Sequence, residues 1–230
     1  MEKEFWHGRW ANNRIGFHTL EVNENLKESW QKLAARRGDQ VFVPLCGKSL
    51  DVLWLLEQGH EIVGVELSSV AVEALFEENG IGIRRKTIGP LGVYQAPGLT
   101  IYCGDFFNLT RTMLGRTAIV YDRGSLVALP SEMRHRYAQH LQFLLPSRCR
   151  ILLITLEYEQ TEMSGPPFAV HLNEIQMLYG NGYTVECLAH RDILDAESHF
   201  KKRGLTALNE VVHLLTPIDS GLQMANKANR

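Results

Sequence analysis

Short apolar runs alternate with amphipathic stretches along most of the chain. The apolar runs have the length of strands that are buried on both faces of a parallel sheet. Between them, apolar residues recur three and four positions apart, which is typical of helices that pack on a sheet. The predicted strands are 41–45, 61–67, 99–103, 118–121, 150–156, 183–190 and 206–215. The predicted helices are 4–12, 25–37, 69–79, 130–145 and 172–180, with one more between Leu50 and Gly59.

The order of these elements predicts an α/β fold. Five strands of βα type are followed by two strands that we expect to form an antiparallel hairpin. This order predicts a doubly wound, seven-stranded mixed sheet with helices on both faces. We expect one domain over residues 1–217, in which 1–37 form a helical lid, and a disordered tail at 218–230. The segment 89–98 is rich in glycine and proline and is expected to be a loop.

One segment early in the chain combines a strand, a turn with one glycine, a helix and a second strand. Gly47 supplies the turn, and helical spacing predicts that Leu50, Leu53 and Trp54 face the sheet. Glu66 ends the second strand roughly 20 residues beyond the turn, where an acid can accept hydrogen bonds from ribose hydroxyls. The segment therefore predicts an adenosine-binding site.

The turn also indicates which adenosine compound binds. A dinucleotide site would need G-x-G-x-x-G, because the backbone must approach a pyrophosphate, whereas PLCGKS at 44–49 has one glycine. A Walker A motif ending in Gly47-Lys48-Ser49 would need glycine at position 42, which is Phe42. S-adenosylmethionine carries no phosphate, so one glycine and one ribose acid suffice. The segment favours this methyl donor; NAD, or a structural βαβ unit with a solvated Glu66, are the alternatives.

Composition and charge exclude several classes of function. The 230 residues carry a net charge of −2, which is not the basic footprint of a nucleic-acid-binding protein. No apolar run is long enough to cross a membrane, so we expect a cytoplasmic protein. The four cysteines, Cys46, Cys103, Cys149 and Cys187, are scattered and are expected to be buried free thiols. The nine histidines form no H-E-x-x-H motif, and we expect no metal.

Several motifs together resemble a known family. They are Trp6-x-x-x-Trp10, Phe17-His18, PLCGKS at 44–49, GHEIVGVELS at 59–68, YDRGSLVAL at 121–129 and GPPF at 165–168. In this combination the chain resembles the thiopurine S-methyltransferases, and most of all the shorter bacterial members, from about residue 5 to 217. The family belongs to the class I S-adenosylmethionine-dependent methyltransferases, whose seven-strand plan matches the predicted order of elements.

The resemblance implies roles for particular residues. Trp10, Leu45, Glu66 and Arg123 would contact the methyl donor, and Asp105 and Phe106 would flank its adenine. Longer relatives carry an arginine near the position of His199 that is thought to help bind the thiol, and this chain lacks it.

The chemistry of methyl transfer to sulfur suggests further roles. Arg123 would act as the catalytic residue that holds a thiolate, with Phe17 stacked on the substrate ring. The expected substrates are thiopurines and other small aromatic thiols, and selenium or tellurium compounds are further candidates. We expect a monomer that acts on a small molecule and binds neither nucleic acid nor membrane.

Other interpretations compete at several positions. Trp6 and Trp10 could belong to the core, Asp105 could cap the next turn, and Arg123 could form a surface ion pair. The GPPF segment is similar to a proline motif of methyltransferases that act on nucleic-acid amino groups, but its place after the fifth strand favours a wall of the substrate pocket. Basic clusters at 134–136 and 201–203 are expected to be solvated surface. A methyl-donor-binding module without turnover, or a methyltransferase for another small nucleophile, are the alternative functions.

Overall fold

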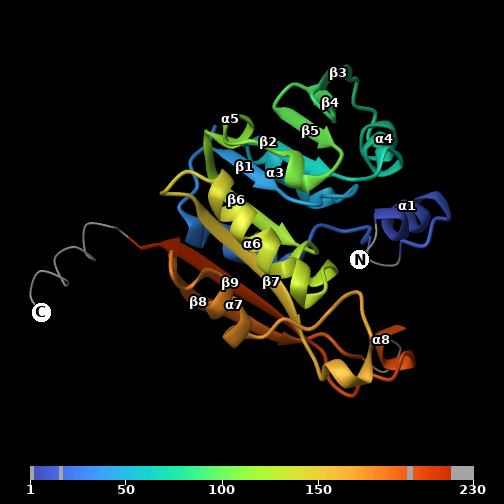
Figure 1. Cartoon of the computed structure of the whole chain (residues 1–230), viewed down its shortest axis with the longest axis vertical. Helices are drawn as coiled ribbons and strands as arrows, with labels where there is room; N and C mark the ends of the chain where they lie inside the picture. The colour runs from blue at the N-terminus through green and yellow to red at the C-terminus, as the bar shows by residue number, and fades with distance from the viewer. Residues whose placement is uncertain (1–2, 16–17, 196–198, 219–230) are drawn as a thin grey trace, which may run out of the picture.

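The computed structural model describes residues 3–15, 18–195 and 199–218, and Figure 1 shows one open sheet with helices on both faces. Within these residues nine strands follow the order β3-β4-β5-β2-β1-β6-β7-β9-β8. They are β1 (Gln40–Val43), β2 (Glu61–Glu66), β3 (Arg84–Ile88), β4 (Leu91–Ala96), β5 (Leu99–Cys103), β6 (Thr117–Arg123), β7 (Arg150–Glu157), β8 (Tyr183–Asp192) and β9 (Asn209–Pro217). The doubly wound α/β class is confirmed.

The predicted number of seven strands is wrong, because the segment 89–98 is not a loop. Seven of the strands, in the order β5-β2-β1-β6-β7-β9-β8, follow the expected plan, including the antiparallel β8–β9 pair. An antiparallel hairpin, β3–β4, extends the sheet beyond β5. Two-residue connections at Gly89-Pro90 and Pro97-Gly98 join these strands, with φ of 56° at Gly89 and 72° at Gly98. The glycines and prolines therefore mark tight turns between short strands.

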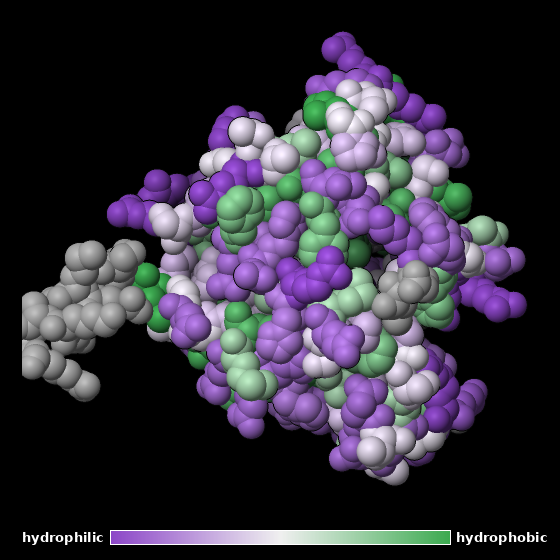
Figure 2. All heavy atoms as spheres, in the orientation of Figure 1, coloured by the Kyte–Doolittle hydropathy of each residue, from purple (hydrophilic) through white to green (hydrophobic). Residues whose placement is uncertain are grey.

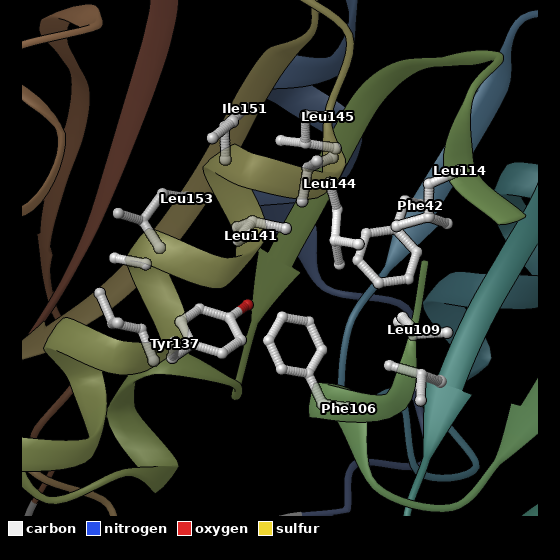
Figure 3. Packing of buried hydrophobic residues seen from close by; sticks show 14 of the residues in the cluster. Phe42, Phe106, Leu109, Leu114, Tyr137, Leu141, Leu144, Leu145, Ile151 and Leu153 are labelled. Atoms are coloured by element: carbon white, nitrogen blue, oxygen red, sulfur yellow. The ribbon is translucent and has the colours of Figure 1, made fainter. Parts of the chain in front are cut away.

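Helices cover both faces of the sheet. They are α1 (Lys3–Ala11), α2 (Glu24–Ser29), α3 (Leu50–Glu57), α4 (Ser69–Glu78), α5 (Arg111–Leu114), α6 (Ser131–Leu144), α7 (Leu172–Tyr179) and α8 (His199–Lys202). One hydrophobic core lies between the sheet and the helices α6 and α7, which cover one of its faces. Figure 3 shows Phe42, Phe106, Tyr137 and Leu141 packed within it. A second core contains residues of α2, α3 and α4 and the strands beneath them.

The predicted helix 25–37 is shorter than expected. It is observed as α2 followed by a 3-10 turn, Trp30–Leu33, and it ends where Ala34 adopts a left-handed φ of 44°. Leu26, Trp30 and Leu33 are buried in the second core. This part of the predicted lid is therefore packed against the sheet, and α1 remains the candidate for a lid among the described residues.

Two predictions about burial hold only in part. The buried residues of α3 are Asp51, Val52 and Leu55, whereas Leu53 and Trp54 are half-buried and pack against the second core. Apolar spacing alone did not identify the buried side of α3, because that side includes Asp51, which is buried with polar partners. The expectation of buried thiols fails for Cys187, which is exposed on the edge strand β8. The tail at 219–230 lies outside the described residues.

Candidate active site

A cavity of about 410 Å³ lies at the carboxyl ends of the central parallel strands. This volume is within the roughly 300–1,000 Å³ that is usual for small-molecule sites. Both α1 and α8 lie at this end of the sheet in Figure 1, so segments from opposite ends of the chain enclose the cavity. Of the residues predicted for the site, Trp10, Leu45, Glu66 and Arg123 line it. Asp51, Tyr121, Arg203 and Glu210 also line it and were not predicted.

Glu66 ends β2 with its carboxylate buried and held by the backbone. Its Oε2 accepts from the N–H of Gly47 at 2.9 Å, and its Oε1 accepts from the N–H of Ser68 at 2.8 Å. Burial raises the pKa of Glu66, while the backbone hydrogen bonds from Ser68 and Gly47 act to lower it. A carboxylate offers about four lone-pair positions, so about two remain for a ligand. The geometry suits a pair of ribose hydroxyls.

The turn before α3 brings the backbone and Trp10 together. Leu45 and Gly47 have φ values of 44° and 54°, a left-handed conformation that glycine adopts without strain. A Cβ on Gly47 would lie 3.1 Å from Cζ2 of Trp10. The missing side chain therefore lets the indole lie against the turn. Trp10 is both buried and part of the cavity wall, and Trp6 lines the cavity beside it.

Successive side chains of β6 point to opposite faces of the sheet. Tyr121 and Arg123 line the cavity, whereas Asp122 points into the opposite core. There the hydroxyl of Tyr137 donates to Oδ2 of Asp122 at 2.6 Å, and the N–H of Leu126 donates to Oδ1 at 3.3 Å. Burial raises the pKa of Asp122 to about 6. Within residues 3–15, 18–195 and 199–218, no carboxylate lies within ion-pair distance of Arg123, so the surface ion-pair interpretation finds no support.

A buried polar network forms the floor of the cavity. The hydroxyl of Tyr121 donates to Oδ2 of Asp51 at 2.8 Å, and the backbone N–H of Asn23 donates to Oδ1 of Asp51 at 2.8 Å. The side-chain amides of Asn23 and Asn25 both donate to the carboxylate of Glu210. The network joins α2, α3, β6 and β9. Tyr121 could have been identified from the sequence, because it lies two residues before Arg123 on the same strand and therefore on the same face. The sequence contains no comparable signal for Asp51 or Glu210.

The proline loop walls the cavity, as predicted. Pro166 and Pro167 line it, and the hydroxyl of Tyr158 donates to the carbonyl oxygen of Pro167 at 2.6 Å. The basic cluster 201–203 is exposed, as expected, and Arg203 also lines the cavity. In the cluster 134–136 only Arg134 differs from the expectation, because it is buried and forms an ion pair with Glu174 at 2.7 Å.

The remaining predicted residues do not meet in the cavity. Asp105 and Phe106 are not among the residues that line it. Asp105 forms an ion pair with Lys3 at 2.6 Å and accepts from the N–H of Phe107, which is the capping role considered as its alternative. The ring of Phe106 packs against Tyr137 in the core (Figure 3). Phe17 lies outside the described residues.

The charges around the cavity favour an anion near Arg123. Burial lowers the pKa of His18, and the positive charges of Lys48 and Arg123 lower it further. His18 is therefore neutral at pH 7. Lys48 forms an ion pair with Glu78 at 2.6 Å, which leaves Arg123 rather than Lys48 as a positive charge for a ligand. A positive charge beside a thiol stabilises the thiolate form.

The described residues fit S-adenosylmethionine. The buried Glu66 carboxylate has capacity for the ribose hydroxyls, and the indoles of Trp6 and Trp10 offer aromatic surface to a sulfonium cation. No group of three or more histidine, cysteine, aspartate or glutamate side chains in the described part of the chain could hold a metal ion. In the same residues, no helix combines the length and the apolar character that crossing a bilayer requires.

Solved structures with low sequence identity share the fold. An S-adenosylmethionine-dependent methyltransferase from Anabaena variabilis has a TM-score of 0.64 at 13% identity, with 94% of this chain and 95% of that chain covered. A 1,6-didemethyltoxoflavin-N1-methyltransferase from Burkholderia thailandensis, solved with S-adenosylhomocysteine, has a TM-score of 0.60 at 16% identity, with 93% and 87% covered. The class I methyltransferase fold is thereby confirmed.

Sequence relatives identify the family. The family model for thiopurine S-methyltransferase (TPMT) matches residues 1–217. A thiopurine S-methyltransferase from Nitrosospira multiformis is 48% identical over 215 residues, which cover 94% of this chain and 98% of the relative. One from Pseudomonas fluorescens (strain Pf0-1) is 47% identical over 213 residues, with 93% and 98% covered. The chain therefore belongs to the thiopurine S-methyltransferase family of S-adenosylmethionine-dependent enzymes.

Proposed function

We propose that this enzyme transfers a methyl group from S-adenosylmethionine to the sulfur of thiopurines and other small aromatic thiols. The observation that carries the proposal is one cavity with a buried, backbone-held carboxylate, Glu66, and the guanidinium of Arg123. Glu66 would bind the ribose hydroxyls. Arg123 would hold the thiolate, and Trp10 and Leu45 would surround the donor between them.

The residues of the cavity would act mainly by positioning. When bound, the donor supplies an electrophilic methyl group on a sulfonium. Alignment of two reacting groups in one site can lower a barrier by roughly 7–11 kcal/mol. The indoles of Trp6 and Trp10 would exclude water, and the wall formed by Pro166 and Pro167 would limit the acceptor to a flat molecule.

We also propose contacts to the adenine and to the acceptor. Asp105 and Phe106 follow β5, which is parallel to β2, so their backbone lies at the same end of the sheet as Glu66. The Asp105 carboxylate is engaged by Lys3, and contact with adenine would need that ion pair to open. Phe17 remains a proposed partner of the acceptor ring because its side chain could stack on an aromatic thiol, and the neighbouring His18 lines the cavity.

A methyl-transfer assay tests the proposal. Radiolabelled S-adenosylmethionine should label thiophenol and 6-mercaptopurine, and calorimetry should detect binding of S-adenosylhomocysteine but not NADH. Binding without transfer to either thiol would favour the donor-binding module. Transfer only to oxygen or nitrogen acceptors would favour a different nucleophile. Selenide and tellurite, as further acceptors, test the selenium and tellurium expectation.

We propose that the enzyme acts as a monomer, in the cytoplasm, on dissolved small molecules rather than on nucleic acid or membrane. Among the coloured residues in Figure 2, green apolar side chains are scattered between purple polar ones and form no continuous patch on this face. The net charge of −2 favours neither nucleic acid nor an anionic membrane surface. Sedimentation analysis should give a mass near 26.1 kDa; twice that mass would contradict the monomer.

A further inference from the structure

We propose that Tyr121 and Asp51 form a proton relay that deprotonates acceptor thiols which are not already ionised. The inference rests on the proposed thiol methylation and adds two residues to it. It explains why a tyrosine–carboxylate pair is buried at the floor of a cavity whose other residues bind and orient.

Both members of the pair are fixed in position. The hydroxyl of Tyr121 donates to Oδ2 of Asp51 at 2.8 Å, while the backbone N–H of Asn23 donates to Oδ1 at 2.8 Å. Both residues line the cavity, although neither is more than 1% exposed. Since its hydrogen is directed at Asp51, the oxygen of Tyr121 can only accept a hydrogen bond from a ligand. A thiol S–H is such a donor.

The pair lies beside the proposed thiolate site. Tyr121 and Arg123 are two residues apart on β6, so their side chains share a face and their Cα atoms lie roughly 6.6 Å apart. The charged groups near Tyr121 are Asp51 on α3, Arg123 on β6 and Glu210 on β9. Burial and the Asp51 charge raise the pKa of Tyr121 well above its ordinary value, so it is a neutral phenol that can pass a proton on without storing a negative charge.

The relay conserves protons and electrons. The S–H bond of the acceptor breaks and its proton passes to the oxygen of Tyr121. At the same time the original hydroxyl proton of Tyr121 passes to Oδ2 of Asp51, which becomes a carboxylic acid. The acceptor sulfur forms a bond to the methyl carbon while the bond between that carbon and the donor's sulfonium sulfur breaks. The electron pair of this carbon–sulfur bond remains on the donor's sulfur, which becomes a neutral thioether. Asp51 later releases its proton to solvent.

If the relay operates, the effect of removing it on the rate of methyl transfer should depend on how far the acceptor thiol is ionised. A thiol with a pKa of about 8.5 is only about 3% ionised at pH 7. Without the relay such a thiol would react through that fraction alone, and the rate would fall by about thirtyfold. A thiol that is fully ionised at pH 7 would lose nothing. This contrast separates proton transfer from binding and from packing.

The test compares Tyr121→Phe with wild type on phenylmethanethiol, which is mostly protonated at pH 7, and on 4-nitrothiophenol, which is ionised. We expect kcat/KM for phenylmethanethiol, whose pKa lies above 8.5, to fall by at least about thirtyfold at pH 7 and to recover as the pH rises towards the pKa of the thiol. The value for 4-nitrothiophenol should stay unchanged. Asp51→Asn, which keeps the shape but cannot take up a proton, should show the same selective loss. Tyr179→Phe is the matched control, because the buried hydroxyl of Tyr179 has no hydrogen-bond partner in the described structure.

Other outcomes overturn the relay. Equal losses with both thiols, or weaker S-adenosylhomocysteine binding by Tyr121→Phe, would assign the pair to positioning. Unchanged kinetics with both thiols would show that no relay operates, as would a wild-type enzyme that methylates 4-nitrothiophenol but not phenylmethanethiol. Failure of the wild type to methylate 4-nitrothiophenol at all would instead refute the proposed function itself.

Discussion

Replacement of Glu66 by alanine should weaken binding of S-adenosylhomocysteine while the fold persists. Two backbone N–H groups occupy about half of the lone-pair positions of the carboxylate, which leaves about two for the ribose hydroxyls. A hydrogen bond to a charged group contributes about 1.5–3 kcal/mol. Water that enters the vacated space recovers part of this loss, so we expect the net cost of about one such bond. The dissociation constant should rise about ten- to a hundredfold.

The pH dependence provides a second signature of Glu66. Burial raises its pKa above 4.5, and ribose hydroxyls donate only to the ionised form. Ligand binding should therefore lower this pKa and release a proton. It follows that wild-type affinity falls as the pH decreases through the raised pKa. The alanine variant should lack this decrease.

Calorimetry between pH 5 and 8 measures both effects, and circular dichroism checks the fold. Glu61→Ala is the matched control, because Glu61 occupies the exposed start of the same strand. An unchanged dissociation constant in a folded Glu66→Ala protein would refute the ribose assignment. So would a wild-type affinity that does not vary with pH.

Three further predictions concern Asp122, Arg123 and α1. Burial raises the pKa of Asp122 from 3.8 to about 6, so the free energy of unfolding should fall as the pH rises between these values, by about 3 kcal/mol in all. Asp122→Asn should flatten this dependence in urea titrations, and parallel curves for the two proteins would contradict the assignment. Arg123→Met should lower kcat/KM for aromatic thiols about ten- to a hundredfold, and more than it weakens S-adenosylhomocysteine binding. Arg116→Met, at an exposed arginine, is the control, and equal effects on rate and binding would place Arg123 with the donor. If α1 is a lid that the ligand orders, S-adenosylhomocysteine should slow its limited proteolysis, whereas equal cleavage with and without ligand would indicate a permanently packed helix.

The sequence predicted those elements whose burial is simple. β1, β2 and β5–β7 are apolar runs, and each was predicted within four residues of its observed bounds. β3 was missed because all five of its residues are exposed, so it carries no alternation of buried and solvated positions. β4 was missed because its flanking Gly-Pro and Pro-Gly pairs indicated a loop. A turn pair has the same composition whether it joins strands or lies within a loop, and only pairing with β5 distinguishes them.

The site, like the sheet, could be predicted from the sequence only in part. Glu66 and Arg123 could be predicted because each lies at the end of a recognisable strand. Asp51 could not, because its position depends on partners that are 28 and 70 residues away in the chain. A buried carboxylate is stable only where such donors meet it, and periodicity within one helix does not record them. The structure therefore adds the cavity floor, which the sequence motifs do not contain.

The additional hairpin has a consequence for local unfolding. Edge strands fray first, because one side of their backbone lacks a partner. At this side of the sheet the edge is β3, whose Arg84, Arg85 and Lys86 are exposed and disfavour the addition of a foreign strand. Both strands of the hairpin thus lie outside β5 in the sheet. β5 itself pairs with β2 and precedes Asp105. Opening of the β3–β4 hairpin would leave the strand that carries Glu66 paired on both sides, so hydrogen exchange should proceed inward from β3 and reach β2 late.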